Sequence, residues 1–160
     1  MKNEILEIEI TKQVNCCKNV AFWNYWDQEH LEVVHKGYQN VQILYETDQC
    51  MFSARNIKIP LIGLWVTASI LMVQKDENTL VSYSTQLGVL SKTTVKIKDQ
   101  SKDSCEIVMH YKFYLNSWQK LLKPLLKILI PKWNEKVWIE DLPIKLRRQK
   151  VLRYNFKDFI

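Results

Sequence analysis

Glycine is scarce in this chain, with three residues among 160. Loops that cradle the phosphates of a nucleotide are built from closely spaced glycines, so we expect no nucleotide cofactor. The four cysteines form no C-x-x-C pair, which argues against a structural zinc site and favours free thiols in a reducing compartment. No apolar run is long enough to cross a membrane, and acids interrupt the first apolar stretch, so we expect a cytoplasmic protein.

The composition, with 47% hydrophobic and 25% charged residues, is typical of a globular domain. A length of 160 residues fits one hydrophobic core, so we expect a single domain over residues 1–160. The net charge of +6 favours anionic surroundings, and charge alone does not choose among membrane headgroups, a nucleic acid and an acidic protein. Because no basic strand is interleaved with aromatic residues, we expect no nucleic-acid partner.

Hydrophobic periodicity divides the chain into a strand, short helices, a run of strands and a helical end. Residues 4–14 alternate apolar and polar side chains as a half-buried strand does, whereas over 18–37 apolar residues recur every three or four positions, as in one or two short helices. Short polar turns at 47–49, 75–78 and 99–104 predict sequential hairpins. The strands between the turns are expected at 40–46, 50–59, 63–74, 79–87, 92–98 and 105–115.

The last part of the chain has a helical pattern from Ser117 onward, which we expect Pro124, Pro131 and Pro143 to interrupt. An antiparallel sheet with one apolar face needs a cover, and this segment is the only one long enough to supply it. The predicted fold is α+β, a curved antiparallel sheet around a long C-terminal helix, with an apolar cavity between them. Six aromatic residues are candidates for lining the cavity, although such rings more often fill a core. They are Trp23, Trp26, Phe52, Trp65, Tyr83 and Phe113.

The stretch WDQEHLEVVH holds two of the three histidines behind a carboxylate. On a helix, Asp27 and His30 share a face because they are three residues apart, whereas His35 points well away from His30. Both imidazoles can therefore meet one metal ion only if the helix breaks between them. The simpler interpretation is a solvated helix face, which the spacing alone favours. The third histidine, His110, falls on the polar side of its strand and is expected at the surface.

The pattern Asp-x-x-His-x-x-x-x-His resembles the motif that supplies two iron ligands in the catalytic domain of Rieske-type non-haem oxygenases. That domain belongs to the helix-grip group called SRPBCC or START-like, whose strand order this chain resembles over most of its length. In the family the third ligand is an acid on the long C-terminal helix, and WIEDLPIKLRRQ places Asp141 at the equivalent position. The resemblance implies that His30, His35 and Asp141 bind Fe(II), with Asp27 orienting His30 through its other ring nitrogen.

The Rieske cluster of those oxygenases has no counterpart in this sequence. In the family, two cysteines and two histidines of a separate domain hold a two-iron cluster, and this chain has neither the residue pairs nor the length for it. An iron here would draw electrons from a separate donor protein, or the metal would do redox-neutral work such as polarising a carbonyl. The resemblance also implies a homo-oligomer, because these oxygenases assemble as rings.

Two functions fit the resemblance to SRPBCC proteins. In the first, the protein is an oxygenase-like catalytic subunit in which a mononuclear metal transforms a hydrophobic small molecule. In the second, it has no metal and is a polyketide-cyclase-like enzyme or a carrier of a lipid, pigment or isoprenoid. Both require a hydrophobic small-molecule ligand, and the sequence does not name it.

A cationic stripe lies at the start of the expected C-terminal helix. In SWQKLLKPLLKILIPKW, Lys120, Lys123 and Lys127 fall within one narrow arc, opposite a broad face of leucine and isoleucine. Such a face suits a membrane interface or a groove on a partner, so residues 118–133 are candidates for peripheral membrane attachment. The competing interpretation is a buried cover helix whose lysines extend to solvent.

Overall fold

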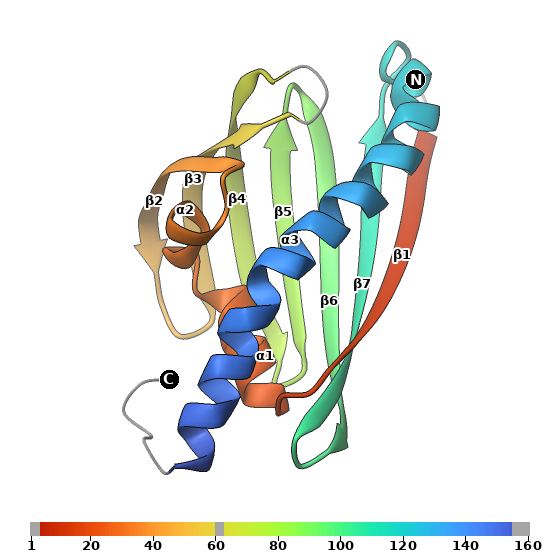
Figure 1. Cartoon of the computed structure of the whole chain (residues 1–160). Coiled ribbons are helices and arrows are strands. Elements are labelled where there is room, and N and C mark those ends of the chain that lie inside the picture. The colour runs from red at the N-terminus through yellow and green to blue at the C-terminus, as the bar shows by residue number, and fades with distance from the viewer. Residues whose placement is uncertain (1–3, 60–62, 155–160) are drawn as a thin grey trace.

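A seven-stranded antiparallel sheet curves around one long helix (Figure 1). This computed structural model describes residues 4–59 and 63–154. The strands are β1 (Glu4–Val14), β2 (Tyr38–Glu46), β3 (Cys50–Lys58), β4 (Trp65–Asp76), β5 (Thr79–Gln86), β6 (Val89–Ser101) and β7 (Ser104–Leu115). The helices are α1 (Lys18–Trp26), α2 (His30–Val34), the 3-10 turn η1 (Gln119–Leu122) and α3 (Lys123–Arg153). The predicted α+β fold is confirmed, including the two short helices after the first strand.

The first strand lies beside the last strand and not beside the second. The order across the sheet is β1-β7-β6-β5-β4-β3-β2. Strand β1 pairs with β7 along its whole length, from Glu4 opposite Leu115 to Val14 opposite Cys105. Helices α1 and α2 therefore carry the chain from one edge of the sheet to the other, which brings α1 against α3 and α2 against β2.

Helix α3 runs unbroken for 31 residues, although we expected Pro131 and Pro143 to interrupt it. A proline in a helix frees the carbonyl four residues earlier, because it has no N–H to donate. Both prolines are exposed, and so are Lys127 and Ile139, the residues four positions before them. The two freed carbonyls therefore lie on the solvent side, where water satisfies them. Pro124 stands in the first turn, where a missing N–H costs nothing.

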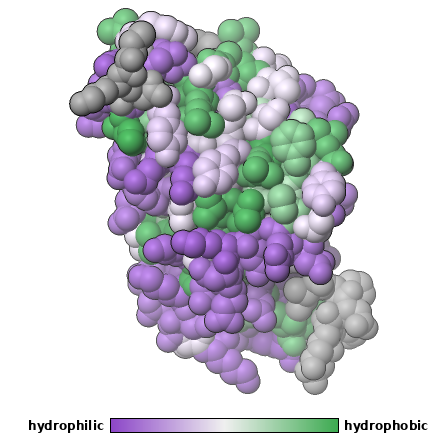
Figure 2. Space-filling model, turned by 180° about the vertical axis from the view of Figure 1, so that it is seen from behind, coloured by the Kyte–Doolittle hydropathy of each residue, from purple (hydrophilic) through white to green (hydrophobic). Residues whose placement is uncertain are grey.

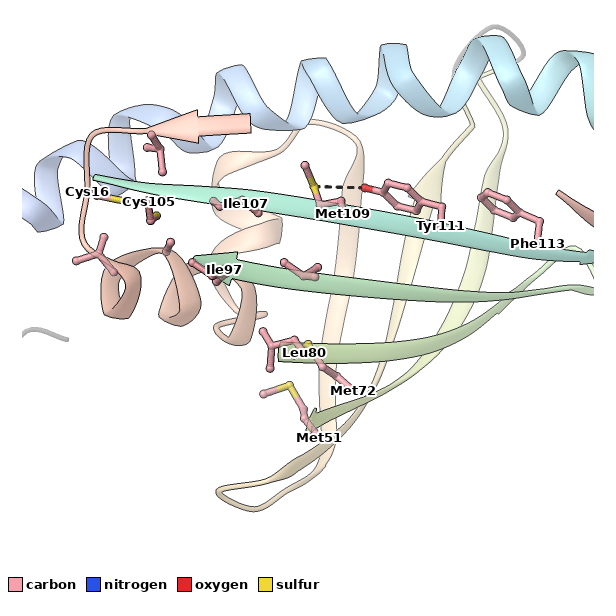
Figure 3. Close-up of a cluster of buried hydrophobic side chains, with 14 of the residues drawn as sticks. Cys16, Met51, Met72, Leu80, Ile97, Cys105, Ile107, Met109, Tyr111 and Phe113 are labelled. Carbon is pink, nitrogen blue, oxygen red and sulfur yellow. Dashed lines mark hydrogen bonds between the residues drawn. The ribbon is translucent and has the colours of Figure 1, made fainter. Parts of the chain in front are cut away.

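The apolar core lies between the concave face of the sheet and the helices (Figure 3). Strand β7 shows the alternation most clearly, since every second residue from Cys105 to Leu115 is buried. Met51, Met72 and Leu80 continue the core across the neighbouring strands. Each such side chain contributes about 2 kcal/mol of hydrophobic stabilisation when fully buried. The core therefore fixes which residues of each strand face inward.

Three of the six predicted cavity residues lie on the other face of the sheet. Phe52, Trp65 and Tyr83 point outward from the convex face, and 37 to 40% of each residue is exposed, so their assignment to a cavity was wrong. The reason is the alternation of side chains along a strand: Met51 takes the inward position next to Phe52. Figure 2 looks onto this convex face, where apolar side chains gather above a hydrophilic band.

Apolar residues of α3 such as Leu126, Ile130 and Trp138 pack against the core but stay partly exposed, and the side chains that this helix buries fully are polar. They are Asn134, Asp141, Lys145 and Gln149. Two hollows formed by the described residues, of about 790 and 640 Å³, lie at the C-terminal end of α3 and on the convex face. Neither is the apolar cavity that we expected between sheet and helix. Within residues 4–59 and 63–154, no helix is long and apolar enough to cross a membrane.

Candidate metal site

The chain breaks its helical path on both sides of α2, and this break determines where the two histidines point. Helix α1 ends at Trp26, and the carboxylate of Asp27 then accepts hydrogen bonds from the backbone N–H groups of Glu29 and His30, at 3.1 and 3.3 Å. After Val34 the backbone becomes extended at His35, with φ −105° and ψ 115°. His35 therefore leaves the helical spacing, which allows both imidazoles to turn toward one point.

The point that both imidazoles reach is the carboxylate of Asp141 on α3. The Oδ1 atom of Asp141 lies 3.3 Å from His30 Nε2 and 2.9 Å from His35 Nε2. One ligand atom from each of the three residues can be chosen so that all lie within 4.8 Å of one another. His35 is 1% exposed and Asp141 6%. The alternative of a solvated helix face was therefore wrong for His35, and the structure brings together the three residues that the sequence singled out.

The three converging atoms do not satisfy one another by hydrogen bonding. His30 Nε2, His35 Nε2 and Asp141 Oδ1 are buried, and each lacks a correctly aligned hydrogen-bond partner among the described residues. Burying such polar atoms without partners costs on the order of 1 to 3 kcal/mol each. The cluster is therefore unsatisfied as it stands, and an ion bound between the three atoms would remove this cost.

Other side chains hold the outward-facing atoms of the cluster. His35 Nδ1 lies 2.7 Å from Glu140 Oε2, and because a carboxylate only accepts, this nitrogen carries the proton and donates it. A neutral His35 then presents its lone pair at Nε2. The second oxygen of Asp141, Oδ2, accepts hydrogen bonds from Asn24 Nδ2 at 3.0 Å and Lys145 Nζ at 3.2 Å. Both contacts hold the Asp141 carboxylate so that Oδ1 points toward the histidines.

Asp27 lies near His30 but does not bind its ring firmly. Asp27 Oδ2 is 3.8 Å from His30 Nδ1, which is too long for a hydrogen bond, and 3.7 Å from a terminal nitrogen of Arg148. The structure thus places Asp27 on the Nδ1 side of His30, without the hydrogen bond through which it was expected to orient the ring. Its closest contacts, however, are with the backbone at the start of α2.

The electrostatics of the cluster keep the Asp141 carboxyl group ionised. Burial raises the pKa of Asp141, but its close electrostatic contacts with His30, His35 and Lys145 outweigh burial and lower the pKa far below its usual value. Burial lowers the pKa of His30, and its interactions with Asp141 and Asp27 reverse this and raise the pKa to about 9. An anionic carboxylate beside two imidazoles is an environment that favours a bound cation.

Lys145 is a fully buried cation next to this carboxylate. Burial lowers the pKa of its ammonium group, against the opposing effect of Asp141. The Nζ atom also lies 4.9 Å from the ring centroid of Trp138 and 5.5 Å from that of Tyr25, at distances typical of cation–π contacts. Lys145 is therefore fixed by its surroundings and in turn fixes Asp141.

The donor set fits a metal ion. Two imidazole nitrogens and one carboxylate oxygen, with the remaining positions open, suit ferrous iron, and similar sets bind catalytic zinc. Metal bonds of about 2.0 to 2.2 Å place neighbouring ligand atoms roughly 3 Å apart, which is close to the 2.9 and 3.3 Å observed here.

The other residues singled out in the sequence lie at different places in the structure. Trp23 lies close to the site, with its ring centroid 6.4 Å from that of His30, and Trp26 donates a hydrogen bond from Nε1 to Glu46 at 3.1 Å. Phe113 is buried in the apolar core. His110 is on the outer face of β7 beside Glu7, which confirms its surface position.

The lysines at the start of α3 do not form one free stripe. Lys123 is half-buried and pairs with Glu4, whereas Lys120 and Lys127 are exposed. Leu126 and Ile130 pack against the core, so one face of this segment does cover the sheet, while several apolar residues on its other side are exposed. They are Trp118, Leu121, Leu125 and Ile128.

Sequence reasoning missed the residues that support the cluster from behind. Asn24, Glu140 and Lys145 were not singled out, although a signal pointed to the last two of them. Lys145 stands four residues after Asp141 and so shares its helix face, and Glu140 directly precedes Asp141. Asn24 gave no such signal, because only the packing of α1 against α3 brings it to Asp141.

Comparison with known proteins places the chain by its fold. No family model matches the chain, and no curated protein matches it. A START superfamily protein from Mycobacterium smegmatis superposes with a TM-score of 0.74 at 12% identity, covering 91% of this chain and 98% of that one. The fold is the START-type helix grip.

Two enzymes share this helix-grip fold at similar coverage. The Zhui aromatase/cyclase from a Streptomyces species has a TM-score of 0.71 at 11% identity, with 92% of this chain and 95% of that chain covered. Norcoclaurine synthase from Thalictrum flavum has a TM-score of 0.70 at 13% identity, with 92% and 98% covered. None of the three is a Rieske-type oxygenase, so the narrower resemblance of the histidine motif gains no support from them.

Proposed function

We propose that this helix-grip protein binds one divalent metal ion, ferrous iron, through His30, His35 and Asp141, and uses it to transform a hydrophobic small molecule. One observation carries the proposal: three buried ligand atoms converge without satisfying one another. The outward-facing atoms of His35 and Asp141 are held by Glu140, Asn24 and Lys145. Histidines that bind metals in proteins commonly donate their second ring N–H to a carboxylate in the same way, which orients the imidazole.

The chain's own residues would divide the work at such a site. Asp141 and the two imidazoles would bind the ion. Glu140 keeps the proton on the far nitrogen of His35, so that Nε2 is free to bind. Bound ferrous iron supplies Lewis acidity and, given electrons from a separate donor protein, the capacity to react with dioxygen.

A second candidate function needs no metal. It is supported by the likeness in fold to the aromatase/cyclase and to norcoclaurine synthase. In this case the protein is a cyclase-like enzyme or a carrier, and His30, with its pKa raised to about 9 by Asp141 and Asp27 against the effect of burial, is a proton donor near neutral pH. The same cluster would then exchange protons with a small molecule in place of holding an ion.

Elemental analysis separates the two candidates. Protein without a polyhistidine tag, prepared anaerobically with added iron, is expected to hold about one iron per chain, and the His30→Ala, His35→Ala double variant none. His110→Ala is the matched control, because that histidine is on the outer face of the sheet, and it should retain the iron. Wild-type protein without metal after this treatment would rule out the metal function and leave the cyclase or carrier.

A further inference from the structure

Arg55 is a cation on the inner face of β3. Its neighbours two residues away, Ser53 and Ile57, are buried against the core, and alternate residues of a strand share one face. The side chain of Arg55 therefore points toward the interior that α3 covers, and the residue is only partly exposed. A guanidinium remains charged at all physiological pH values, so this position brings a permanent positive charge inside the molecule.

The described residues leave this charge without a counter-ion. Two other arginines, Arg148 and Arg153, lie beside the carboxylates of Asp27 and Asp103. By contrast, no carboxylate in residues 4–59 and 63–154 comes within 4.0 Å of the Arg55 guanidinium. A cation taken from water without a partner is costly, and burial accordingly lowers the pKa of Arg55.

The guanidinium group also has unused hydrogen-bonding capacity. One terminal nitrogen donates to the side-chain oxygen of Gln28, and the guanidinium carbon lies 5.2 Å from the ring centroid of Tyr38. The Nε atom is buried and has no hydrogen-bond partner among the described residues. A guanidinium has five N–H donors arranged as a fork that matches two oxygens of one anion.

Tyr38 connects Arg55 to the proposed metal site. The Tyr38 ring centroid lies 5.5 Å from that of His35, and that of Trp133 lies 6.2 Å from Tyr38 on the α3 side. Arg55 is thus separated from a proposed metal ligand by a single aromatic ring. A small molecule held at the guanidinium would have the Tyr38 ring beside its body, and His35 is the next ring beyond Tyr38.

We infer that Arg55 binds a carboxylate group of the substrate, so that the apolar or aromatic remainder lies along Tyr38 toward His30, His35 and Asp141. Binding of the carboxylate by Arg55 stands by itself, whereas the direction in which the rest of the substrate lies rests on the proposed metal function. The inference deepens that function by naming the substrate class, a small carboxylic acid with an apolar or aromatic body. Such an anion supplies the missing counter-ion and also accepts hydrogen bonds from the free N–H groups of the guanidinium.

The test uses 4-fluorobenzoate as the probe and its neutral counterpart, 4-fluorobenzamide, both followed by fluorine NMR. Wild-type protein is expected to bind the carboxylate at least tenfold more tightly than the amide. Arg55→Met should abolish this preference, and Arg55→Lys, which keeps the charge but not the fork, should retain part of it. Lys12→Met is the matched control, since Lys12 is a partly buried cation that already pairs with Glu135, and it should bind like wild type.

Three outcomes would overturn the inference. The first is equal affinity of wild-type protein for the carboxylate and the amide. The second is a preference for the carboxylate that stays at the wild-type level in every Arg55 variant that folds, so that Arg55→Lys alone decides if Arg55→Met does not fold. The third is displacement of the probe by an equal concentration of inorganic phosphate, which would assign Arg55 to a phosphate group.

A paramagnetic ion separates failure of this inference from failure of the metal function. With Mn²⁺ added, fluorine relaxation of bound 4-fluorobenzoate should increase in wild-type protein and not in the His30→Ala, His35→Ala variant. Binding that depends on Arg55 without any effect of Mn²⁺ would support the carboxylate site and contradict the metal site. An effect of Mn²⁺ on a probe that binds independently of Arg55 would support the metal site and contradict the carboxylate site.

Discussion

Glu140 is the residue on which the chemistry of His35 depends most directly. Its carboxylate accepts the Nδ1 proton at 2.7 Å, which orients the ring and raises the basicity of the opposite nitrogen. The contact is half-buried, since 23% of the Glu140 side chain is exposed, so the residue can be altered without opening the core. A change at Glu140 therefore tests the effect of orienting His35 without removing a proposed metal ligand.

Replacing Glu140 by Gln should weaken metal binding by about 10- to 100-fold while leaving the fold intact, because a neutral amide holds the imidazole proton less strongly. Titration with Co²⁺, followed by visible absorption against a competing chelator, measures the change. Glu135→Gln is the control, as Glu135 is exposed on the same helix and pairs with Lys12 outside the site. Equal Co²⁺ affinities for both variants would show that Glu140 has no role in the site.

The site could be predicted from the sequence only in part. The motif around His30 and His35 and the position of Asp141 followed from a family resemblance, whereas the spacing gave only a condition, that the two imidazoles can meet if the helix breaks between them. The supporting contacts could not be predicted in the same way, because 117 residues separate Asn24 from Asp141 and only tertiary packing joins them. Arg55 gave no signal either, since nothing in a sequence reports that a charge lacks a partner.

At the scale of elements, α3 departs most from what hydrophobic periodicity indicates. A cover helix normally buries its apolar residues, yet α3 buries Asp141, Lys145 and Gln149 and exposes Ile139 and Leu146. The sequence therefore predicted the helix itself, but not that its fully buried positions are polar. Periodicity assumes that the interior is apolar, and this assumption fails where the interior holds a polar site.

The strands were predicted more accurately than their faces. Residues 4–14 match β1, and the expected hairpins occur, because alternation and polar turns are local signals. Which side of a strand is buried depends on the register with neighbouring strands, and aromatic residues such as Phe52 fit either face. The cavity prediction failed for this reason.

The start of α3 should bind anionic lipid surfaces. Leu121 is 82% and Ile128 56% exposed, and the exposed cations Lys120 and Lys127 lie beside them. No acidic residue occurs between 116 and 133 to oppose the attraction. Exposed apolar groups next to lysines are typical of segments that enter a membrane interface.

Flotation with vesicles that contain phosphatidylserine measures this binding. Changing Leu121 and Ile128 together to Ser should reduce the floated fraction severalfold, and raising the salt concentration should reduce it for wild type. Ile139→Ser is the control, because Ile139 is 61% exposed on α3 and lies outside residues 118–133. Flotation that is the same for all three proteins would contradict a lipid-binding role for this segment.

At the scale of the whole molecule, the proposed metal site joins the two halves of the chain. His30 and His35 belong to the segment that crosses from β1 to β2, and Asp141 belongs to the last helix. A ligand that binds only the folded state stabilises it by about 2.7 kcal/mol at a hundredfold excess over its dissociation constant. Bound metal should therefore raise the free energy of unfolding of the whole domain and not only stabilise the residues around the site.

Anaerobic thermal unfolding with and without Fe²⁺ tests this expectation. For a domain of this size a gain of about 2.7 kcal/mol corresponds to an increase of roughly 5 to 10 °C in the midpoint. The His30→Ala, His35→Ala variant should show no increase. An equal increase in this variant would mean that iron acts on the protein elsewhere.

The separation of the ligands along the chain also sets the time at which the site can form during synthesis. His35 and its carboxylate partner Glu140 are 105 residues apart. A nascent chain on the ribosome carries both histidines long before α3 has been translated, and the third ligand reaches them only when that helix docks on the finished sheet. Loading of the proposed metal would therefore be a late event in the life of the molecule, which follows completion of the fold and cannot guide its early steps.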